Sequence, residues 1–283
     1  MALLLALLSA AAYGTSDYVG GLASSRAPAW QVAVVVMLTA TVLSIPVSLV
    51  AGGTPTAHDW LLGSAGGAAS GVGAGFLYRG LAHGRMTVVA PLSGVIAAVI
   101  PVIVGLATGD HPAPLALVGI ACAGPAIVLV AGGGAEQTAS GDRPAERDRA
   151  AILDGVLAGV GFGMLFTTTG LLSDSAGLRV LPALDGAGLL GVIAVASLQG
   201  QAWLPRERAA WRGWPSGLLG LGAVACVTLA YRHGLMSVVS VIASLYPAVT
   251  VVLAALLLGE RIGRAQAIGL LLAAASVALV ATG

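Results

Sequence analysis

Hydrophobic residues fall in ten blocks along the chain, separated by short segments that carry turn-forming residues, as at Gly52–Pro55 and Asp110–Pro112. Each block is long enough to cross a lipid bilayer as a helix, which takes roughly 17–25 residues. The blocks lack the alternation of a membrane β-barrel. The pattern predicts an all-α integral membrane protein with ten transmembrane helices. The expected helices are Ala2–Leu22, Trp30–Val50, Leu61–Leu81, Val88–Ala107, Leu115–Ala131, Ala151–Leu172, Val180–Leu198, Trp214–Tyr231, Val238–Leu258 and Ala265–Ala281.

One long polar segment interrupts this pattern. Gly132–Arg149 holds four acids and three arginines and has no large apolar residue. Such a segment cannot bury enough apolar surface to fold alone, so we interpret it as a solvated linker. It divides the chain into a first five-helix repeat at residues 1–131, a linker at 132–150 and a second five-helix repeat at 151–283.

The two halves share short sequences in the same order. Met86–Val89 recurs in similar form as Met236–Val239, 150 residues later, and Tyr78-Arg79 returns as Tyr231-Arg232. Further pairs are Tyr13-Gly14 with Phe162-Gly163, Pro28 with Pro182, Gly109-Asp110 with Gly259-Glu260, and Gly119 with Gly269. The nearly constant offset indicates an internal duplication.

Because five is odd, the second repeat must enter the membrane inverted relative to the first. The expected topology puts eleven arginines on the face of the linker and only Arg179 and Arg232 on the other face. Basic residues favour the cytoplasmic side, so we expect a cytoplasmic linker and both termini outside the cytoplasm. Two inverted repeats can open a shared cavity to each side in turn, which predicts transport by alternating access.

Composition narrows the class of protein further. The chain is 58% hydrophobic and 9% charged, too few charges for a soluble surface. A net charge of +1 argues against a nucleic-acid partner. The two cysteines lie inside apolar blocks, the four histidines form no ligand pattern and no P-loop is present, so we expect no cofactor, no metal and no ATP-driven step. Met1–Ala12 also resembles a signal peptide, but it lacks a basic n-region.

Three motifs carry a family resemblance: Tyr13–Asp17 (YGTSD), Tyr78-Arg79 leading into Gly84–Pro91 (GRMTVVAP), and Gly259–Arg261 (GER). With the five-plus-five architecture, the chain resembles the drug/metabolite transporter superfamily, in particular its ten-helix EamA-type members. The first half departs from the pattern at Gly109–His111, where the second half has GER. The resemblance implies a plasma-membrane secondary transporter that exports or imports a small metabolite or drug, with export as the favoured direction. Its partners would be the small-molecule substrate and the lipid bilayer. The alternatives are a non-transport scaffold or signalling protein and a membrane-embedded enzyme.

Asp17 is the first candidate site residue, because an acid inside a membrane span is costly and is functional by default. Desolvation penalises the charged form of a carboxyl group, so such an acid is suited to bind and release a proton, and it also suits a cationic group. The alternative interpretation is a helix-end acid that reaches the interface or pairs with Arg79 or Arg85.

Asp185 occupies the repeat position that Gln31 holds in the first half, which suggests a polar pair facing a shared cavity. Alternatively, both residues lie near the ends of their helices and are simply exposed to water. Asp154, at the start of its helix, is expected to favour the helix N-terminus and is given no transport role.

The remaining candidates are aromatic, basic and proline residues. Tyr13, Tyr78 and Tyr246 are predicted to line a substrate cavity, although an interfacial aromatic belt also explains Tyr78. Arg79 and Arg232 end their helices on opposite faces, as snorkelling anchors or as a pair of gating residues. Pro91, Pro101 and Pro247 are predicted hinges, and glycines at four-residue spacing predict close helix packing.

Overall fold

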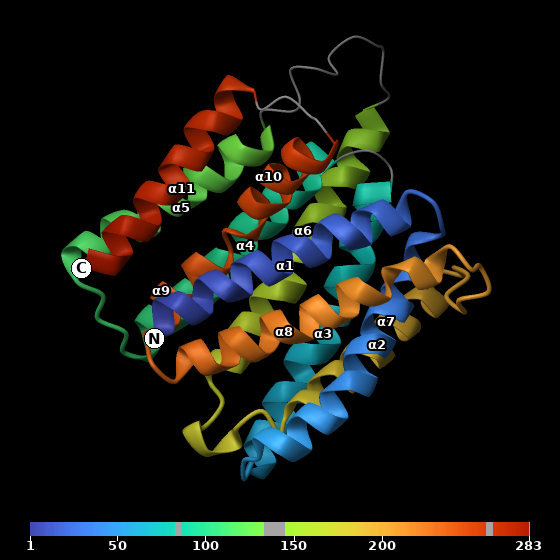
Figure 1. Ribbon diagram of the computed structural model, residues 1–283, viewed down its shortest axis with the longest axis horizontal. Coiled ribbons are helices and arrows are strands. Elements are labelled where there is room, and N and C mark those ends of the chain that lie inside the picture. Colours follow the sequence, from blue (N-terminus) through green and yellow to red (C-terminus); the bar gives the residue numbers. More distant parts are fainter. Residues whose placement is uncertain (83–85, 133–144, 259–262, 283) are drawn as a thin grey trace.

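The computed structural model describes residues 1–82, 86–132, 145–258 and 263–282, and within them the secondary structure is helical (Figure 1). Arg85 and the GER motif, both named in the sequence predictions, lie outside these residues. The helices are α1 (Ala2–Ser24), α2 (Ala29–Ala51), α3 (Ala57–Ala82), α4 (Met86–Thr108), α5 (Pro114–Gly132), α6 (Ala145–Gly170), the 3₁₀ turn η2 (Asp174–Ala176), α7 (Leu181–Leu198), the 3₁₀ turn η3 (Ala210–Gly213), α8 (Trp214–Tyr231), α9 (Met236–Ala243), α10 (Tyr246–Leu258) and α11 (Arg264–Thr282).

Successive long helices run up and down the bundle. The two chain termini lie at the same end, here called the terminus end, and the end of α5 and the start of α6 lie at the other, the linker end (Figure 1). The connections that carry Arg26, Arg206 and Arg208 are at the linker end, whereas Arg179 and Arg232 are at the terminus end. Each of these five arginines therefore lies at the end of the bundle at which the sequence predicts it.

Seven stretches of the described chain are long and apolar enough to span a membrane, and Leu92–Thr108 and Pro114–Val130 are shorter apolar helices. The helix α3 is long but rich in glycine, so it lies outside both groups. Its position explains this composition: α3 packs against α6 and α7 over much of its length, where small residues allow close approach. The helical class of the protein is thus confirmed.

Contacts between the halves form matching sets. The third helix of the first half, α3, packs on α6 and α7, and the third helix of the second half, α8, packs on α1 and α2. Likewise α4 packs on α6, while α9 and α10 pack on α1. The last helices of the halves, α5 and α11, pack on each other. Exchanging the halves therefore maps the principal contacts onto one another.

The glycines predicted to pack helices do so. A Cβ atom at Gly67 or Gly71 would collide with the backbone carbonyl of Leu184 or Gly188 on α7. On α6, a Cβ atom at Gly159 would lie 2.9 Å from the backbone carbonyl oxygen of Ser93 on α4. These contacts join α3 to α7 and α4 to α6 backbone to backbone, which leaves little room for sliding within each pair.

The ninth predicted helix is not continuous. It is interrupted at Ser244 and Leu245, between α9 and α10, and Pro247 is the second residue of α10. Proline has no N–H to donate to the preceding turn and disfavours helical geometry in the residue before it, which accounts for the break. Its counterpart α4 runs unbroken through Pro91 and Pro101; the side chain of Pro91 is outside the described part.

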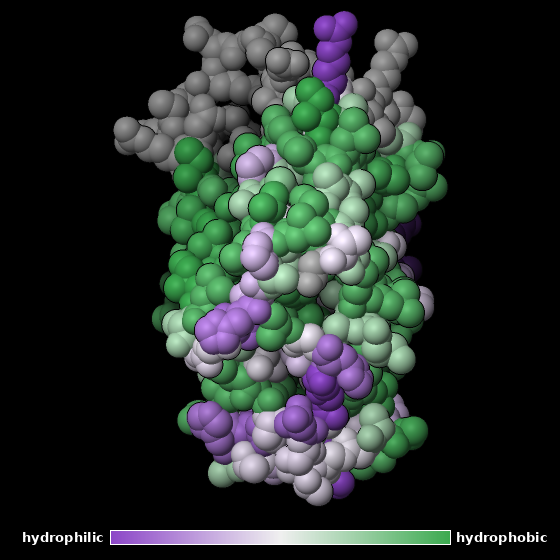
Figure 2. Space-filling view, turned by 90° about the vertical axis from the view of Figure 1, so that its left-hand side faces the viewer, coloured by the Kyte–Doolittle hydropathy of each residue, from purple (hydrophilic) through white to green (hydrophobic). Residues whose placement is uncertain are grey.

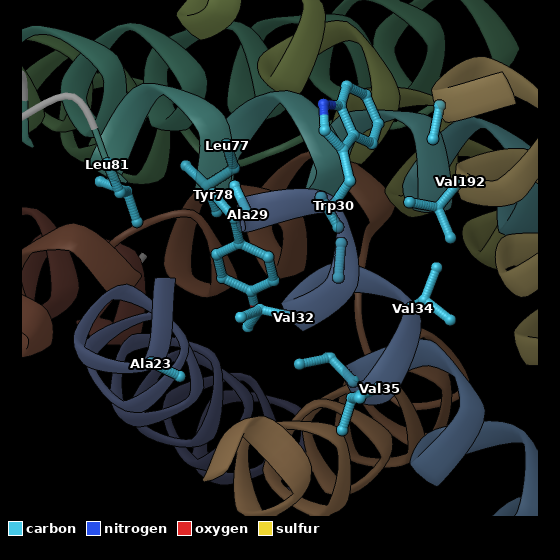
Figure 3. Close-up of a cluster of buried hydrophobic side chains, with 14 of the residues drawn as sticks. Ala23, Ala29, Trp30, Val32, Val34, Val35, Leu77, Tyr78, Leu81 and Val192 are labelled. Carbon is cyan, nitrogen blue, oxygen red and sulfur yellow. The ribbon is translucent and has the colours of Figure 1, made fainter. Parts of the chain in front are cut away.

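Hydrophobic residues cover most of the upper and middle surface of the face in Figure 2, and hydrophilic residues gather toward its lower end. Large apolar side chains such as Val50, Leu190 and Leu271 are exposed. An apolar outer surface of this kind is suited to contact the hydrocarbon core of a bilayer, where its side chains are not exposed to water. The interior holds a cluster around Trp30, Val32 and Leu77 (Figure 3), to which α1, α2, α3, α4, α6, α7 and η3 contribute.

Candidate functional site

A cavity of about 50 Å³ lies between the two halves of the bundle. Its wall comes from α1, α2 and α3 of the first half and from α6, α7 and α8 of the second, that is, from the first three helices of each half. The volume is enough for a few water molecules, so a larger solute requires the surrounding helices to move apart. The lining residues are Tyr13, Ser16, Asp17, Val36, Met37, Ala40, Gly67, Ser70, Ala74, Tyr78, Phe162, Leu184, Asp185, Gly188, Gly217, Gly220 and Val224.

Two carboxyl groups face this cavity, Asp17 from α1 and Asp185 from α7. Asp185 is 4% exposed, and its Oδ2 atom has no hydrogen-bond partner among the described residues. The interpretation of Asp185 as an acid wetted at the helix end is therefore wrong. Asp17 is half-buried and lines both this cavity and a smaller one beside it.

Tyr13 lines the same cavity as the two acids. Its hydroxyl is buried without a hydrogen-bond partner in the described part of the chain, and both Asp17 and Asp185 are near enough to act on it electrostatically. Its ring contacts Phe166 edge-on at a centroid distance of 5.8 Å. Tyr246, whose hydroxyl hydrogen-bonds to the Ser93 hydroxyl at 3.0 Å, lines the smaller cavity together with Tyr13 and Asp17.

Toward the linker end, the cavity-lining residues Ser16 and Tyr78 share Ser216 as a hydrogen-bond partner. The Ser16 and Ser216 hydroxyls lie 2.8 Å apart, and the Tyr78 hydroxyl lies 3.0 Å from that of Ser216. Figure 3 shows the Tyr78 ring extending from α3 toward Val32 of α2. The ring also fills the space beside Gly20 of α1, where a Cβ would be 2.5 Å from it. Tyr78 is thus a buried cavity residue, and the interfacial-belt interpretation is wrong for it.

Other predicted site residues lie elsewhere. Gln31 is buried outside both cavities, and its Oε1 atom accepts a hydrogen bond from the backbone N–H of Glu207 at 3.2 Å. Arg232 ends α8 at the terminus end, where it lines a separate polar cavity with Asp174 and Tyr231. The structure therefore separates Gln31 from Asp185, although the two occupy equivalent repeat positions.

Arg79 forms an ion pair with Asp154 at the linker end. Its Nη1 atom also donates to Oε1 of Gln199 at 2.8 Å, and its guanidinium lies 4.6 Å from the centroid of the Phe76 ring. The acid partner of Arg79 is therefore on α6 and not Asp17. The bonds join the last turn of α3 to α6 and to the end of α7.

Comparisons with known proteins identify the family. The EamA-like transporter family matches the chain twice, over residues 1–132 and 151–282. The chain belongs to the EamA-like transporter family. The resemblance to the drug/metabolite transporter superfamily is thereby confirmed, and with its membrane-spanning helices the protein is a multi-pass membrane protein of a transporter family rather than of an enzyme family.

A solved structure titled "Crystal structure of protein" is similar to this EamA-family chain with a TM-score of 0.69 at 14% sequence identity. The similarity covers 98% of this chain and 95% of the other. At that identity the likeness establishes a shared fold and nothing about a substrate. A comparison with curated proteins gives no match.

Three residues in or near the site of this EamA-family protein were not identified from the sequence. Phe162 lines the cavity beside Asp17, and its repeat relation to Tyr13 was a signal that could have identified it. Ser216 gave no signal, because a serine in the first turn of an apolar helix is commonplace. Asp154 was given only a helix-terminal role, whereas it holds Arg79.

Proposed function

We propose that this EamA-family protein is a secondary active transporter that exports a small metabolite or drug-like solute across the plasma membrane. Ten crossing segments, arranged as inverted repeats at residues 1–131 and 151–283, would expose a central site to each side in turn. The observation that carries this proposal is the cavity lined by the first three helices of both halves. A site shared by two repeats is what alternating access requires.

Coupling to protons through Asp17 completes the proposal. The Asp17 carboxyl faces both cavities, and the described residues contain one ion pair, Arg79–Asp154, so neither acid of the cavity has a basic partner there. An acid that is surrounded by helices and reaches the cavity can exchange a proton with whichever side is open. The linker would then be cytoplasmic and both termini extracytoplasmic.

Reconstitution in proteoliposomes tests the proposal. A panel of labelled metabolites is followed with and without an imposed pH gradient, and wild-type protein is expected to accumulate at least one solute only with the gradient. Asp17→Asn should abolish that accumulation, while Asp17→Glu should retain part of it. The matched control is Glu207→Gln, because Glu207 is an exposed acid outside the cavity. Wild-type accumulation by Asp17→Asn would exclude Asp17 as the coupling residue.

A further inference from the structure

The Oδ2 atom of Asp185 is buried and has no hydrogen-bond donor among the described residues. Asp185 is 4% exposed, it lines the central cavity, and Oδ2 accepts no hydrogen bond from any described residue. A buried polar atom without a hydrogen bond is costly, and a carboxylate oxygen is more costly than a neutral one. The cavity beside this oxygen is therefore a place where a hydrogen-bond donor is stabilised.

The charge of the cavity wall determines which kind of hydrogen-bond donor the cavity favours. Asp17 and Asp185 both contribute carboxyl groups, and none of its lining residues is arginine, lysine or histidine. Carboxylates only accept hydrogen bonds, and in a low-dielectric interior an uncompensated pair attracts a cation and repels an anion. The wall thus favours a positively charged N–H donor over a carboxylate or phosphate.

Aromatic rings supply the rest of the recognition surface. Tyr13, Tyr78 and Phe162 line the cavity, and the Tyr13 hydroxyl offers a further unpaired polar atom. Ring faces attract cations, and Val36 and Met37 give the wall an apolar portion. An amine joined to a small apolar or aromatic body would satisfy both the acids and the apolar wall.

We propose that the cavity binds a small organic amine as its ammonium cation, with N–H groups donating to Asp185 and to the Tyr13 hydroxyl and with Asp17 supplying the second negative charge. This assignment rests on the proposed function, because it names the substrate class of the same site. Asp185 contributes a hydrogen bond as well as charge, so a quaternary ammonium without N–H groups is a poorer ligand than a primary amine.

Four probes of similar shape test this assignment on purified full-length protein in detergent, by isothermal titration calorimetry: benzylammonium, benzyltrimethylammonium, benzyl alcohol and benzoate. Benzylammonium is expected to bind at least about tenfold more tightly than the other three. Asp185→Asn should weaken benzylammonium binding by about tenfold or more, whereas Glu207→Gln should leave it unchanged. Circular dichroism and gel filtration verify that each variant is folded.

Three outcomes would overturn the assignment: equal or tighter binding of benzyltrimethylammonium, benzyl alcohol or benzoate, wild-type affinity in Asp185→Asn, or no binding of benzylammonium to wild-type protein. The probe series on wild-type protein remains decisive if the variant fails to fold. Solute flux in proteoliposomes distinguishes a failure of the substrate assignment from a failure of the proposed transport function. Binding of benzylammonium without flux of any solute would contradict transport alone, and gradient-driven flux of neutral or anionic solutes without benzylammonium binding would contradict the substrate class alone.

Discussion

The carboxylate of Asp59 accepts two hydrogen bonds from Ser173, one from its backbone N–H and one from its hydroxyl, each at 2.8 Å. Asp59 lies in the first turn of α3, and Ser173 follows the end of α6. At the other end of the same two helices, Arg79 of α3 pairs with Asp154 of α6. Polar bonds therefore tie α3 to α6 at both ends, and glycine contacts hold them together in between. We infer that α3 and α6 move as one body.

Replacing Asp59 should loosen the terminus end of this pair. Burial alone would raise the pKa of Asp59, but the hydrogen bonds from Ser173 and Thr56 outweigh it and hold the pKa below its ordinary value. A carboxyl with a lowered folded pKa stabilises the protein above its unfolded pKa, and this stabilisation is lost as the pH falls through the folded pKa. Asp59→Ala should cost about 1–3 kcal/mol near neutral pH.

Thermal unfolding in detergent at several pH values measures this effect. The difference in Tm between wild type and Asp59→Ala should be largest near neutral pH and shrink in acid. The control is Asp174→Ala, because Asp174 is an exposed acid of the neighbouring 3₁₀ turn. A difference in Tm that stays constant down to strongly acidic pH would show that the ionised Asp59 carboxylate is not the stabilising species.

The Arg79–Asp154 pair should show strong coupling in a double-mutant cycle. Asp154 is 5% exposed and Arg79 is 27% exposed, so removing the arginine leaves a buried carboxylate without its cation. Arg79→Gln should therefore destabilise by about 3–5 kcal/mol, and adding Asp154→Asn should restore part of that loss. Chemical or thermal unfolding of the two single variants and the double variant gives the coupling. Additive losses would mean that the two side chains act independently.

The helices were predictable from the sequence because apolar block length alone decides what can cross a bilayer, and most predicted ends lie within a few residues of the observed ones. The break at Ser244 and Leu245 was missed because Pro247 is compatible with a kinked, continuous helix as well as with an interrupted one.

The candidate site was only partly predictable. One cavity is lined by four of the predicted residues, Tyr13, Asp17, Tyr78 and Asp185. This was predictable because polar groups inside a membrane span face the interior of the bundle or a cavity and not the lipid. Gln31 does not join them, because the backbone N–H of Glu207 provides it with a partner elsewhere. Long-range hydrogen bonds of this kind leave no periodic trace in one sequence.

Substitution of Gly67 should disrupt the packing of α3 on α7. A Cβ at Gly67 would collide with the Leu184 carbonyl oxygen, and backbone cannot rotate away as a side chain can. Gly67→Ala should therefore destabilise by about 1–3 kcal/mol. Gly222→Ala is the matched control, because a Cβ there meets nothing within 4 Å and alanine favours the helix. Unfolding in detergent compares the two; equal stability of both variants would contradict the tight α3–α7 contact.

Topology can be tested with two exposed positions at opposite ends of the bundle. Ser25 lies in the α1–α2 connection at the linker end, and His58 lies in the first turn of α3 at the terminus end. In a background with Cys122 and Cys226 replaced by serine, we expect an impermeant thiol reagent on intact cells to label His58→Cys but not Ser25→Cys. The opposite labelling pattern would invert the proposed orientation.

Tyr78 should help to keep the linker end of the cavity closed. Its hydroxyl bonds to Ser216, which also bonds to Ser16, so the cluster joins α3, α8 and α1 across the two halves. A buried hydrogen bond contributes about 0.5–1.5 kcal/mol, so Tyr78→Phe should raise the open population by roughly two- to tenfold. The measurement is the rate at which a thiol reagent modifies Ser70→Cys, a buried cavity position, in the same cysteine-free background. Tyr231→Phe, which loses a 2.8 Å bond to Ser240 outside this cavity, is the control and should leave the rate unchanged. Equal rates in wild type and Tyr78→Phe would mean that helix packing, and not this hydrogen bond, closes the linker end.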